Sequence, residues 1–396
     1  MAATSGAVEH PNYAYIDCLR GYAILLVITS HLPYSYPELP YPIRRLSLLG
    51  MTGVQLFFLA SCVTLLLSWH REQTLRGRAD TGAFFLRRAF RIIPAYYLGG
   101  LFYWWLDPPA HGFDLAQFLT AYGFVNLWHP LTAPTVVGQW SVIPGGWSVS
   151  VEFTFYALFP FIAGTVTSLW RAALFTLGAL ILAILANRAG FLLWHQTYST
   201  QVMEGFLSAW FPNQLPVFAL GTLVFFFLGS SRQLISRRFA DTLAAAALVI
   251  LFALAWSSFP MWAGETFSIL CIDQAAALPL AIFVLALSRS APGSFLVNPA
   301  AALVGKISFS AYLLHFAAIE LLPGRFPHVF HTQASGVAAI LAYAAGWLAV
   351  TGATCVGAFC TYHAIERPMI KLGRRLIHLR DSRNSSTGFT HLIERR

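Results

Sequence analysis

The sequence predicts an all-α, polytopic membrane protein with about ten transmembrane helices and both termini in the cytoplasm. Of its 396 residues, 57% are hydrophobic and only 10% are charged, whereas an ordinary soluble domain carries roughly 25% charged residues. The mean hydropathy of +0.63 excludes a soluble globular fold, a disordered chain and a disulfide scaffold. Ten apolar runs are suited to crossing a hydrocarbon core of about 30 Å. They lie near residues 16–33, 51–69, 92–106, 148–165, 172–188, 211–229, 242–258, 267–287, 301–321 and 337–360.

The basic residues orient these runs. Cytoplasmic loops of membrane proteins are enriched in Lys and Arg, and ten spans place both termini on one side. Under this topology, 21 of the 25 Lys and Arg residues fall on the side of the termini. The sequence therefore predicts a multi-pass protein of the inner (plasma) membrane. The four basic residues on the other side are Arg44, Arg45, Arg188 and Arg325.

This topology divides the chain into three segments. Residues 1–14 form a cytoplasmic N-terminal tail, 15–371 the membrane domain and 372–396 a basic cytoplasmic C-terminal tail. The loops account for the net charge of +9, so nucleic acid is not an expected partner. The five cysteines lie in apolar segments without metal-ligand spacing, and we expect them to be small apolar side chains and no metal to be bound.

Three ionisable residues stand in the first span, where such groups cost several kcal/mol and are candidates for function. They are Asp17, Arg20 and His31. The eleven residues from Arg20 to His31 bring the two side chains to within about 20° on one helical face, roughly 16 Å apart along the axis. Asp17 lies one turn before Arg20 and is placed to pair with it. The alternative is an arginine that snorkels to the interface and a histidine exposed at a helix end.

An acid occupies the outer part of the fourth span. Glu152 lies about one turn into this span and is followed by Tyr156 at i+4. We expect Glu152 to face the protein interior, at the depth of His31. The alternative is a structural salt bridge or a helix cap.

A cluster of arginines precedes the third span. Arg88 and Arg91 share a helical face at i, i+3, and Arg87 is adjacent. Arginine clusters at a cytoplasmic membrane surface suit phosphate groups through bidentate hydrogen bonds. Lipid headgroups, or the topology rule alone, explain such a run equally well.

Two further motifs lie near the C-terminus. Ser308, Tyr312 and His315 fall at i, i+4 and i+7 on one face of the ninth span. An intramembrane histidine is either functional or a hydrogen-bond partner between helices. The run Glu366–Arg367–Pro368 closes the last span, where we expect an interfacial anchor.

Taken in order, these segments resemble the integral-membrane acyltransferase-3 family, which includes O-antigen and other polysaccharide O-acetylases and nodulation-factor acetylases. The sequence departs from the family pattern at three positions: Gln55 replaces a common Asp, Cys62 a usual Gly, and Phe153 a second acid. Gln55 and Phe153 are therefore not expected to act as ionisable groups. The matching segments are Asp17–Arg20 with His31, GVQLFFLASC (53–62), RRAFRIIP (87–94), WSVSVEFTFY (147–156), LPVFALG (215–221), GKISFSAYLLH (305–315) and IERP (365–368).

The resemblance implies transfer of an acyl group, usually acetyl from acetyl-CoA, to a carbohydrate hydroxyl. His31 matches the essential histidine of the family, and its imidazole suits a general base because it titrates near neutral pH. Glu152 matches the acid of the WSxxxE pattern, and we expect it to orient His31. The expected donor-binding residues are Arg20, Asp17, Arg88, Arg91 and Ser61. The expected acceptor-binding residues are Trp147, Tyr156, Tyr312 and His315.

Two rival classes share some of these features. A solute transporter also has many spans and buried charges, but it predicts paired helix breaks in two inverted halves, which are not visible here. A membrane glycosyltransferase with a polyprenyl donor would need an acidic pair in an outer loop, for which Asp107 and Asp114 are the candidates. The acceptor, the acyl length, the side of transfer, an acyl-enzyme step and the oligomeric state stay open.

Overall fold

The computed structural model describes residues 14–108, 112, 114–133, 142–230, 237–257, 271–330 and 334–393 of the chain. Within this part the regular elements are all helical, which confirms the predicted all-α class. The expected N-terminal tail lies outside the described residues except for its last residue, Ala14. The helices are α1 (Ala14–His31), α2 (Tyr41–Leu48), α3 (Gly53–Arg76), α4 (Thr81–Leu106), α5 (Leu115–Tyr122), α6 (Trp147–Thr165), α7 (Leu169–Trp194), α8 (Thr200–Ala209), α9 (Phe211–Ser230), α10 (Arg237–Trp256), α11 (Ile272–Arg289), α12 (Pro299–Lys306), α13 (Ser308–Arg325), α14 (Pro327–Phe330), α15 (Gly336–Thr361) and α16 (Arg367–Ile393).

Seven stretches of helix in the described residues are long and apolar enough to cross a membrane, which confirms a polytopic membrane protein. An eighth is the pair α12 and α13, bent by 80°. The two other expected spans correspond to α1 and α4, which are helical but fall outside the seven. Helix α1 carries Asp17, Arg20 and His31, and α4 carries Arg88 and Arg91. The total of ten spans, like the side of the termini, stays a prediction.

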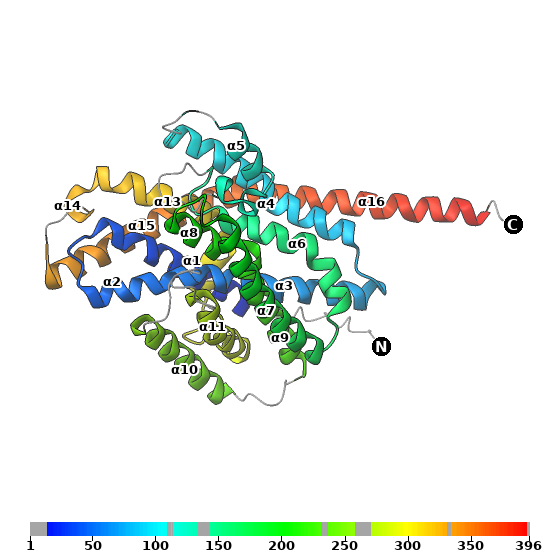
Figure 1. Cartoon of the computed structure of the whole chain (residues 1–396). Helices are drawn as coiled ribbons and strands as arrows, with labels where there is room; N and C mark the ends of the chain where they lie inside the picture. Colours follow the sequence, from blue (N-terminus) through cyan, green and yellow to red (C-terminus); the bar gives the residue numbers. More distant parts are fainter. Residues whose placement is uncertain are drawn as a thin grey trace, which may run out of the picture.

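Helix α1 runs through the centre of the bundle (Figure 1) and packs against α3, α12 and α13. Its crossing with α12 depends on two glycines. A Cβ atom on Gly305 would overlap the carbonyl oxygen of Asp17, and one on Gly21 would overlap that of Ala301. Small residues of this kind let two membrane helices approach to backbone contact.

The predicted ninth span is not a single straight helix. The chain bends by 80° between α12 and α13, at Ile307. The approach of α1 to α12 and this bend together bring the start of α13 beside α1 and α3. Ser308 and Tyr312 consequently face the interior of the bundle rather than following the line of α12.

A π-helical turn, η6 (Tyr362–Glu366), joins α15 to α16. It turns Glu366 into the protein, where the side chain is 1% exposed and accepts a hydrogen bond from Ser310 Oγ at 3.0 Å. Glu366 therefore contacts the protein interior, while the interfacial anchor expected of the run Glu366–Arg367–Pro368 stays a prediction. The extra residue of a π-turn shifts the register of the helix, and a continuous α-helical pattern could not reveal that shift.

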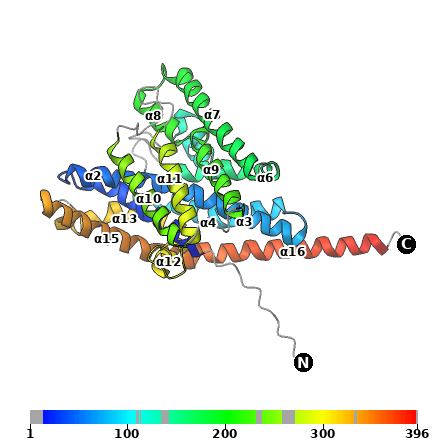
Figure 2. The same ribbon diagram turned by 90° about the horizontal axis from the view of Figure 1, so that it is seen from below.

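Helix α16 continues past residue 372, the expected boundary of the membrane domain, and extends beyond the bundle (Figures 1 and 2). Two ion pairs fasten it to the segment between α3 and α4. Arg380 pairs with Asp80, and Asp381 pairs with Arg76 at 2.9 Å. Asp80 also caps α4 by accepting a hydrogen bond from the Ala83 amide at 2.9 Å, so the arginine-bearing helix α4 begins at a fixed point.

Substitution of Gly305 by Leu tests the crossing of α1 and α12. Because the new side chain meets a backbone carbonyl that cannot rotate away, the overpacking costs at least ~1–3 kcal/mol. We expect a thermal unfolding temperature in detergent that is lower by several degrees. Gly178→Leu is the matched control, since a Cβ at Gly178 meets nothing within 4 Å. Equal unfolding temperatures for the two variants would contradict the close crossing.

Candidate active site

Two cavities lie next to each other at the centre of the bundle. The first, which we call the arginine cavity, measures about 70 Å³ and is formed by α1, α3, α4, α6 and α13. Its small size fits an anionic group or a narrow chain rather than a whole nucleotide. Its walls are Arg20, Val54, Phe57, Phe58, Ser61, Arg88, Arg91, Ile92, Ser148, Val149, Glu152, Tyr156, Ser308, Phe309 and Tyr312.

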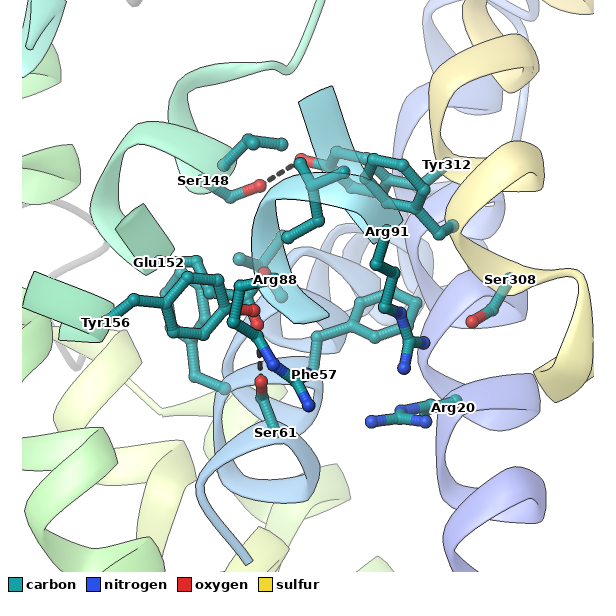
Figure 3. A pocket seen from close by; sticks show the side chains of 15 residues that line it. Arg20, Phe57, Ser61, Arg88, Arg91, Ser148, Glu152, Tyr156, Ser308 and Tyr312 are labelled. Atoms are coloured by element: carbon teal, nitrogen blue, oxygen red, sulfur yellow. Dashed lines mark hydrogen bonds between the residues drawn. The ribbon is translucent and has the colours of Figure 1, made fainter. Parts of the chain in front are cut away.

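Three guanidinium groups converge on the arginine cavity. Figure 3 shows the side chain of Arg20 from α1 and those of Arg88 and Arg91 from α4 pointing toward one another. No carboxylate of the described residues forms an ion pair with any of the three within 4.0 Å. Arg20 donates one hydrogen bond, to Thr64 Oγ1 at 3.3 Å. The cavity thus concentrates positive charge that lacks a directly paired anion, which favours binding of an anionic ligand.

The neighbouring Arg87 behaves differently. Its Nη2 atom forms an ion pair of 2.8 Å with Glu72 on α3, and it does not line the arginine cavity. Arg88 and Arg91, at i and i+3, thus lie on the helix face that lines the cavity, whereas Arg87 lies on another face and is paired with Glu72. This confirms the predicted shared face.

Glu152 is held at the wall of the arginine cavity. Ser61 Oγ donates a hydrogen bond to Glu152 Oε1, marked by a dashed line in Figure 3. Tyr156, one turn further along α6, lines the same cavity. Asp17, expected to pair with Arg20, lines neither cavity and forms no ion pair with it in the described part of the chain.

The second cavity, which we call the histidine cavity, measures about 460 Å³, a size typical of small-molecule sites. It is formed mainly by α1, α8, the start of α11 and the turn before α6. Its walls are Val27, Ser30, His31, Met51, Val54, Gln55, Gly145, Trp147, Gln201, Glu204, Gly205, Ser208, Ala209, Ile272, Asp273, Tyr312 and Phe316.

His31 faces a second histidine. The ring of His315 lies 5.5 Å from that of His31 between centroids, and the Phe316 ring lies at 4.5 Å. His315 Nδ1 is 2.7 Å from the carbonyl oxygen of Tyr312, and a carbonyl only accepts, so Nδ1 carries the proton. Nε2 of His315 is then an acceptor, and this atom is buried without a hydrogen-bond partner among the described residues.

Tyr312 forms the wall between the two cavities. It lines both of them, as does Val54. The Tyr312 hydroxyl donates to the carbonyl oxygen of Gly145 at 2.6 Å. It accepts a hydrogen bond from Ser148 Oγ at 2.8 Å, marked by a dashed line in Figure 3. Two hydrogen bonds therefore hold the Tyr312 side chain in place. Among the described lining residues, Tyr312 is the only aromatic residue that both cavities share.

Comparison with known proteins identifies the family of this chain. A family model described as an acyltransferase domain, acyltransferase-3, matches residues 13–363. The chain belongs to the acyltransferase-3 family. Membership decides between the classes that the sequence left open: the protein is an O-acyltransferase rather than a transporter.

Two curated proteins illustrate the relatives of this acyltransferase. The exopolysaccharide production protein ExoZ of Rhizobium meliloti is 25% identical over 352 residues, which cover 82% of this chain and 91% of that protein. The peptidoglycan O-acetyltransferase OatA of Listeria monocytogenes is 27% identical over 157 residues, which cover 37% of this chain and 23% of OatA. No solved structure matches the chain significantly.

One expected contact of the acyltransferase is absent. The structure does not bring Glu152 to His31, because the two side chains line different cavities. Trp147 at the start of α6 lines the histidine cavity, whereas Glu152, five residues deeper, lines the arginine cavity and binds Ser61. Two residues at a similar depth in the membrane need not face each other, because each helix can be rotated about its own axis. The rotation of α6 determines that Glu152 contacts Ser61 rather than His31.

Sequence reasoning missed two acids of the histidine cavity, Glu204 and Asp273. Asp273 lies in an apolar run, so the rule that flagged Asp17 and Glu152 would also have found it. Glu204 lies on α8, a short helix that the sequence analysis left between two spans. No sequence pattern signalled that α8 folds back against the bundle.

Because three like charges converge on the cavity, we expect removal of one arginine to stabilise the protein and to weaken its binding of anions. Arg91→Gln removes one of the three like charges that line the cavity, so we expect a higher thermal unfolding temperature in the absence of anions. The same variant should lose most of the stabilisation that inorganic pyrophosphate gives the wild-type protein.

Arg87→Gln is the matched control for this experiment. It loses the ion pair with Glu72 but leaves the cavity intact, so its response to pyrophosphate should equal that of the wild-type protein. Undiminished stabilisation of Arg91→Gln by pyrophosphate would contradict an anion site at the three guanidinium groups.

Proposed function

We propose that the protein transfers an acetyl group from acetyl-CoA to a hydroxyl of a polysaccharide or glycoconjugate, in the plasma membrane. The observation that carries the proposal is the pair of adjoining cavities. One concentrates three arginines and the other contains His31, and Tyr312 lies between them. Such a pair provides separate binding sites for an anionic donor and a hydroxyl acceptor at one reaction centre.

The arginine cavity suits the donor. Coenzyme A carries several phosphates, and planar guanidinium groups bind phosphate oxygens in a bidentate manner. A cavity of about 70 Å³ admits the narrow pantetheine arm while the adenine nucleotide stays outside. The predicted topology places this entrance on the cytoplasmic side, where acyl-CoA is made.

The histidine cavity suits the acceptor. The printed names of the relatives, an exopolysaccharide production protein and a peptidoglycan O-acetyltransferase, support a glycan acceptor. Trp147, Tyr312 and Phe316 offer aromatic faces to a sugar ring, and Ser30 and Gln201 offer polar groups. The larger volume of this cavity fits one sugar unit.

His31 is the general base in this mechanism. Its imidazole removes the proton of the acceptor hydroxyl, and the oxygen attacks the thioester carbonyl carbon. The tetrahedral intermediate collapses by breaking the carbon–sulfur bond, and the imidazolium returns its proton to the departing CoA thiolate. His315, rather than Glu152, lies beside His31, with 5.5 Å between the ring centroids, and we expect it to orient the His31 ring.

Replacement of His31 by Ala tests the base. We expect the transfer rate from acetyl-CoA to drop by about 10²–10⁴-fold, while acetyl-CoA still stabilises the purified protein against heat. His195→Ala, at an exposed position at the end of α7, should keep full activity. Transfer at the wild-type rate by the His31→Ala variant would overturn the assignment.

Replacement of Arg88 by Ala tests the donor site. Loss of one charge-assisted contact to phosphate costs roughly 1.5–3 kcal/mol, so we expect the KM for acetyl-CoA to rise about tenfold or more. Arg87→Ala, which removes the arginine paired with Glu72, should leave this KM unchanged. An equal KM for the Arg88 and Arg87 variants would show that phosphate is not bound at the cavity.

A further inference from the structure

A groove on the outside of the bundle lies apart from the two central cavities. It is formed by α7, α9 and α11 and measures about 640 Å³. We propose that this groove and the cavity next to it bind one anionic phospholipid, with an acyl chain in the groove and the phosphate at Arg289. The inference does not depend on the proposed function, because no residue of this site lines the arginine cavity or the histidine cavity.

The groove, which we call the apolar groove, is built from matching stripes on two helices. Leu220, Leu223, Val224 and Phe227 line it from α9, at i, i+3, i+4 and i+7. The lining residues of α11 have the same spacing from Leu278 to Leu285, so each helix presents one continuous face. Helix α9 packs against both α7 and α11 and forms the middle of the groove.

The lining and the size of the apolar groove suit a hydrocarbon chain. Every described residue that lines it is aliphatic or aromatic, and its volume is in the range of small-molecule sites. Trp170 and Leu278 at its walls are 71% and 59% exposed, so the groove opens toward the bilayer. Because bilayer lipid fills any such groove, the apolar lining alone does not single out a ligand.

A charged residue at one end of the groove does single one out. A cavity of about 540 Å³, which we call the Arg289 cavity, shares the lining residue Leu169 with the groove. On α11 the lining passes from Leu285 in the groove to Ser288 and Arg289 in this cavity, one turn later. An amphiphile whose chain occupies the groove therefore reaches Arg289 with its polar end.

The guanidinium group of Arg289 has donors left for such a ligand. Its Nη2 atom donates to the carbonyl oxygen of Leu228 at 3.4 Å, and its Nε atom is buried without a hydrogen-bond partner among the described residues. A cation at the end of α9 favours the helix dipole, but this contact uses only one of five N–H groups. Phosphate oxygens match the remaining planar donors.

No described carboxylate neutralises Arg289. None forms an ion pair with it within 4.0 Å, and the described linings of the groove and of the Arg289 cavity contain no acid. Asp241, on the neighbouring helix α10, is exposed and lines neither. The absence of an acid also selects the headgroup, because the ammonium of a zwitterionic lipid would find no partner in this lining.

The position of Arg289 along the helices fits the level of a lipid headgroup. Trp170, at the start of α7, lines the same groove, and tryptophan is enriched where the hydrocarbon core meets water. The predicted topology places the start of α7 and the ends of α9 and α11 on the cytoplasmic side. Anionic lipids give the cytoplasmic leaflet its negative surface potential, so the expected ligand is present there.

Native mass spectrometry of the detergent-solubilised, delipidated protein tests this site. The probes are dioleoylphosphatidylglycerol and dioleoylphosphatidylcholine, which have the same chains and differ in headgroup charge. We expect one phosphatidylglycerol molecule to bind per chain, with a half-saturating concentration about tenfold lower than that of phosphatidylcholine. A charge-assisted hydrogen bond contributes about this factor.

Two substitutions separate the headgroup from the chain. Arg289→Gln should raise the half-saturating concentration of phosphatidylglycerol about tenfold, to that of phosphatidylcholine, and Arg289→Lys should keep part of the preference because the charge remains. Ala173→Phe fills the groove and should weaken binding of both lipids. The matched controls are Arg375→Gln and Ala189→Phe, at exposed positions on α16 and α7, which should leave both concentrations unchanged.

Equal binding of the two lipids by the wild-type protein would overturn the proposal, and this comparison decides the headgroup even where a variant fails to fold. Phosphatidylglycerol binding that is unchanged in folded Arg289→Gln or Ala173→Phe protein would overturn it as well. A polyprenyl phosphate that binds tenfold more tightly than phosphatidylglycerol, or a dimer of the chain in place of the lipid adduct, would assign the groove to another occupant and overturn the phospholipid site.

Discussion

The rest of the structure depends on one constraint, which is that three arginine side chains share one small cavity and form no ion pair with a carboxylate of the described residues. Like charges that share a small cavity repel one another, and the surrounding helices hold the half-buried side chains of Arg20, Arg88 and Arg91 together. The fixed start of α4 at Asp80 and the close crossing of α1 with α12 at Gly305 provide this hold. We expect an anion bound among the arginines to reduce this repulsion, so that the proposed donor would also stabilise the protein.

The second organising element is the single helix α1. It carries Arg20 at one cavity and His31 at the other, roughly 16 Å apart along its axis. In the proposed mechanism, an extended pantetheine arm that starts among the arginines runs along α1 toward His31. Tyr312, which lines both cavities, is the point that the acyl group passes in this proposal. The proposal thus assigns an anionic donor to one cavity and a hydroxyl acceptor to the other.

Local patterns in the sequence were sufficient for part of this account. Scarcity of charge predicted the membrane fold, and helical spacing predicted that Arg88 and Arg91 share a face. The sequence did not reveal that Glu152 turns away from His31, because the rotation of α6 depends on its packing against α3, where Ser61 binds the acid. It also did not reveal the 80° bend before α13, since an apolar run reads the same whether straight or bent. Both features depend on how one helix is oriented relative to its neighbours. The spacing of residues within a single helix carries no information on that orientation.

The most direct test is a structure of the protein with bound acetyl-oxa(dethia)-CoA, in which oxygen replaces the reactive sulfur. The account predicts phosphate oxygens in contact with Arg88 and Arg91, the pantetheine arm running past Tyr312, and the acetyl carbonyl in the histidine cavity within hydrogen-bond reach of His31. Phosphates bound away from the arginines, or an acetyl group that ends on the arginine side of Tyr312, would contradict it.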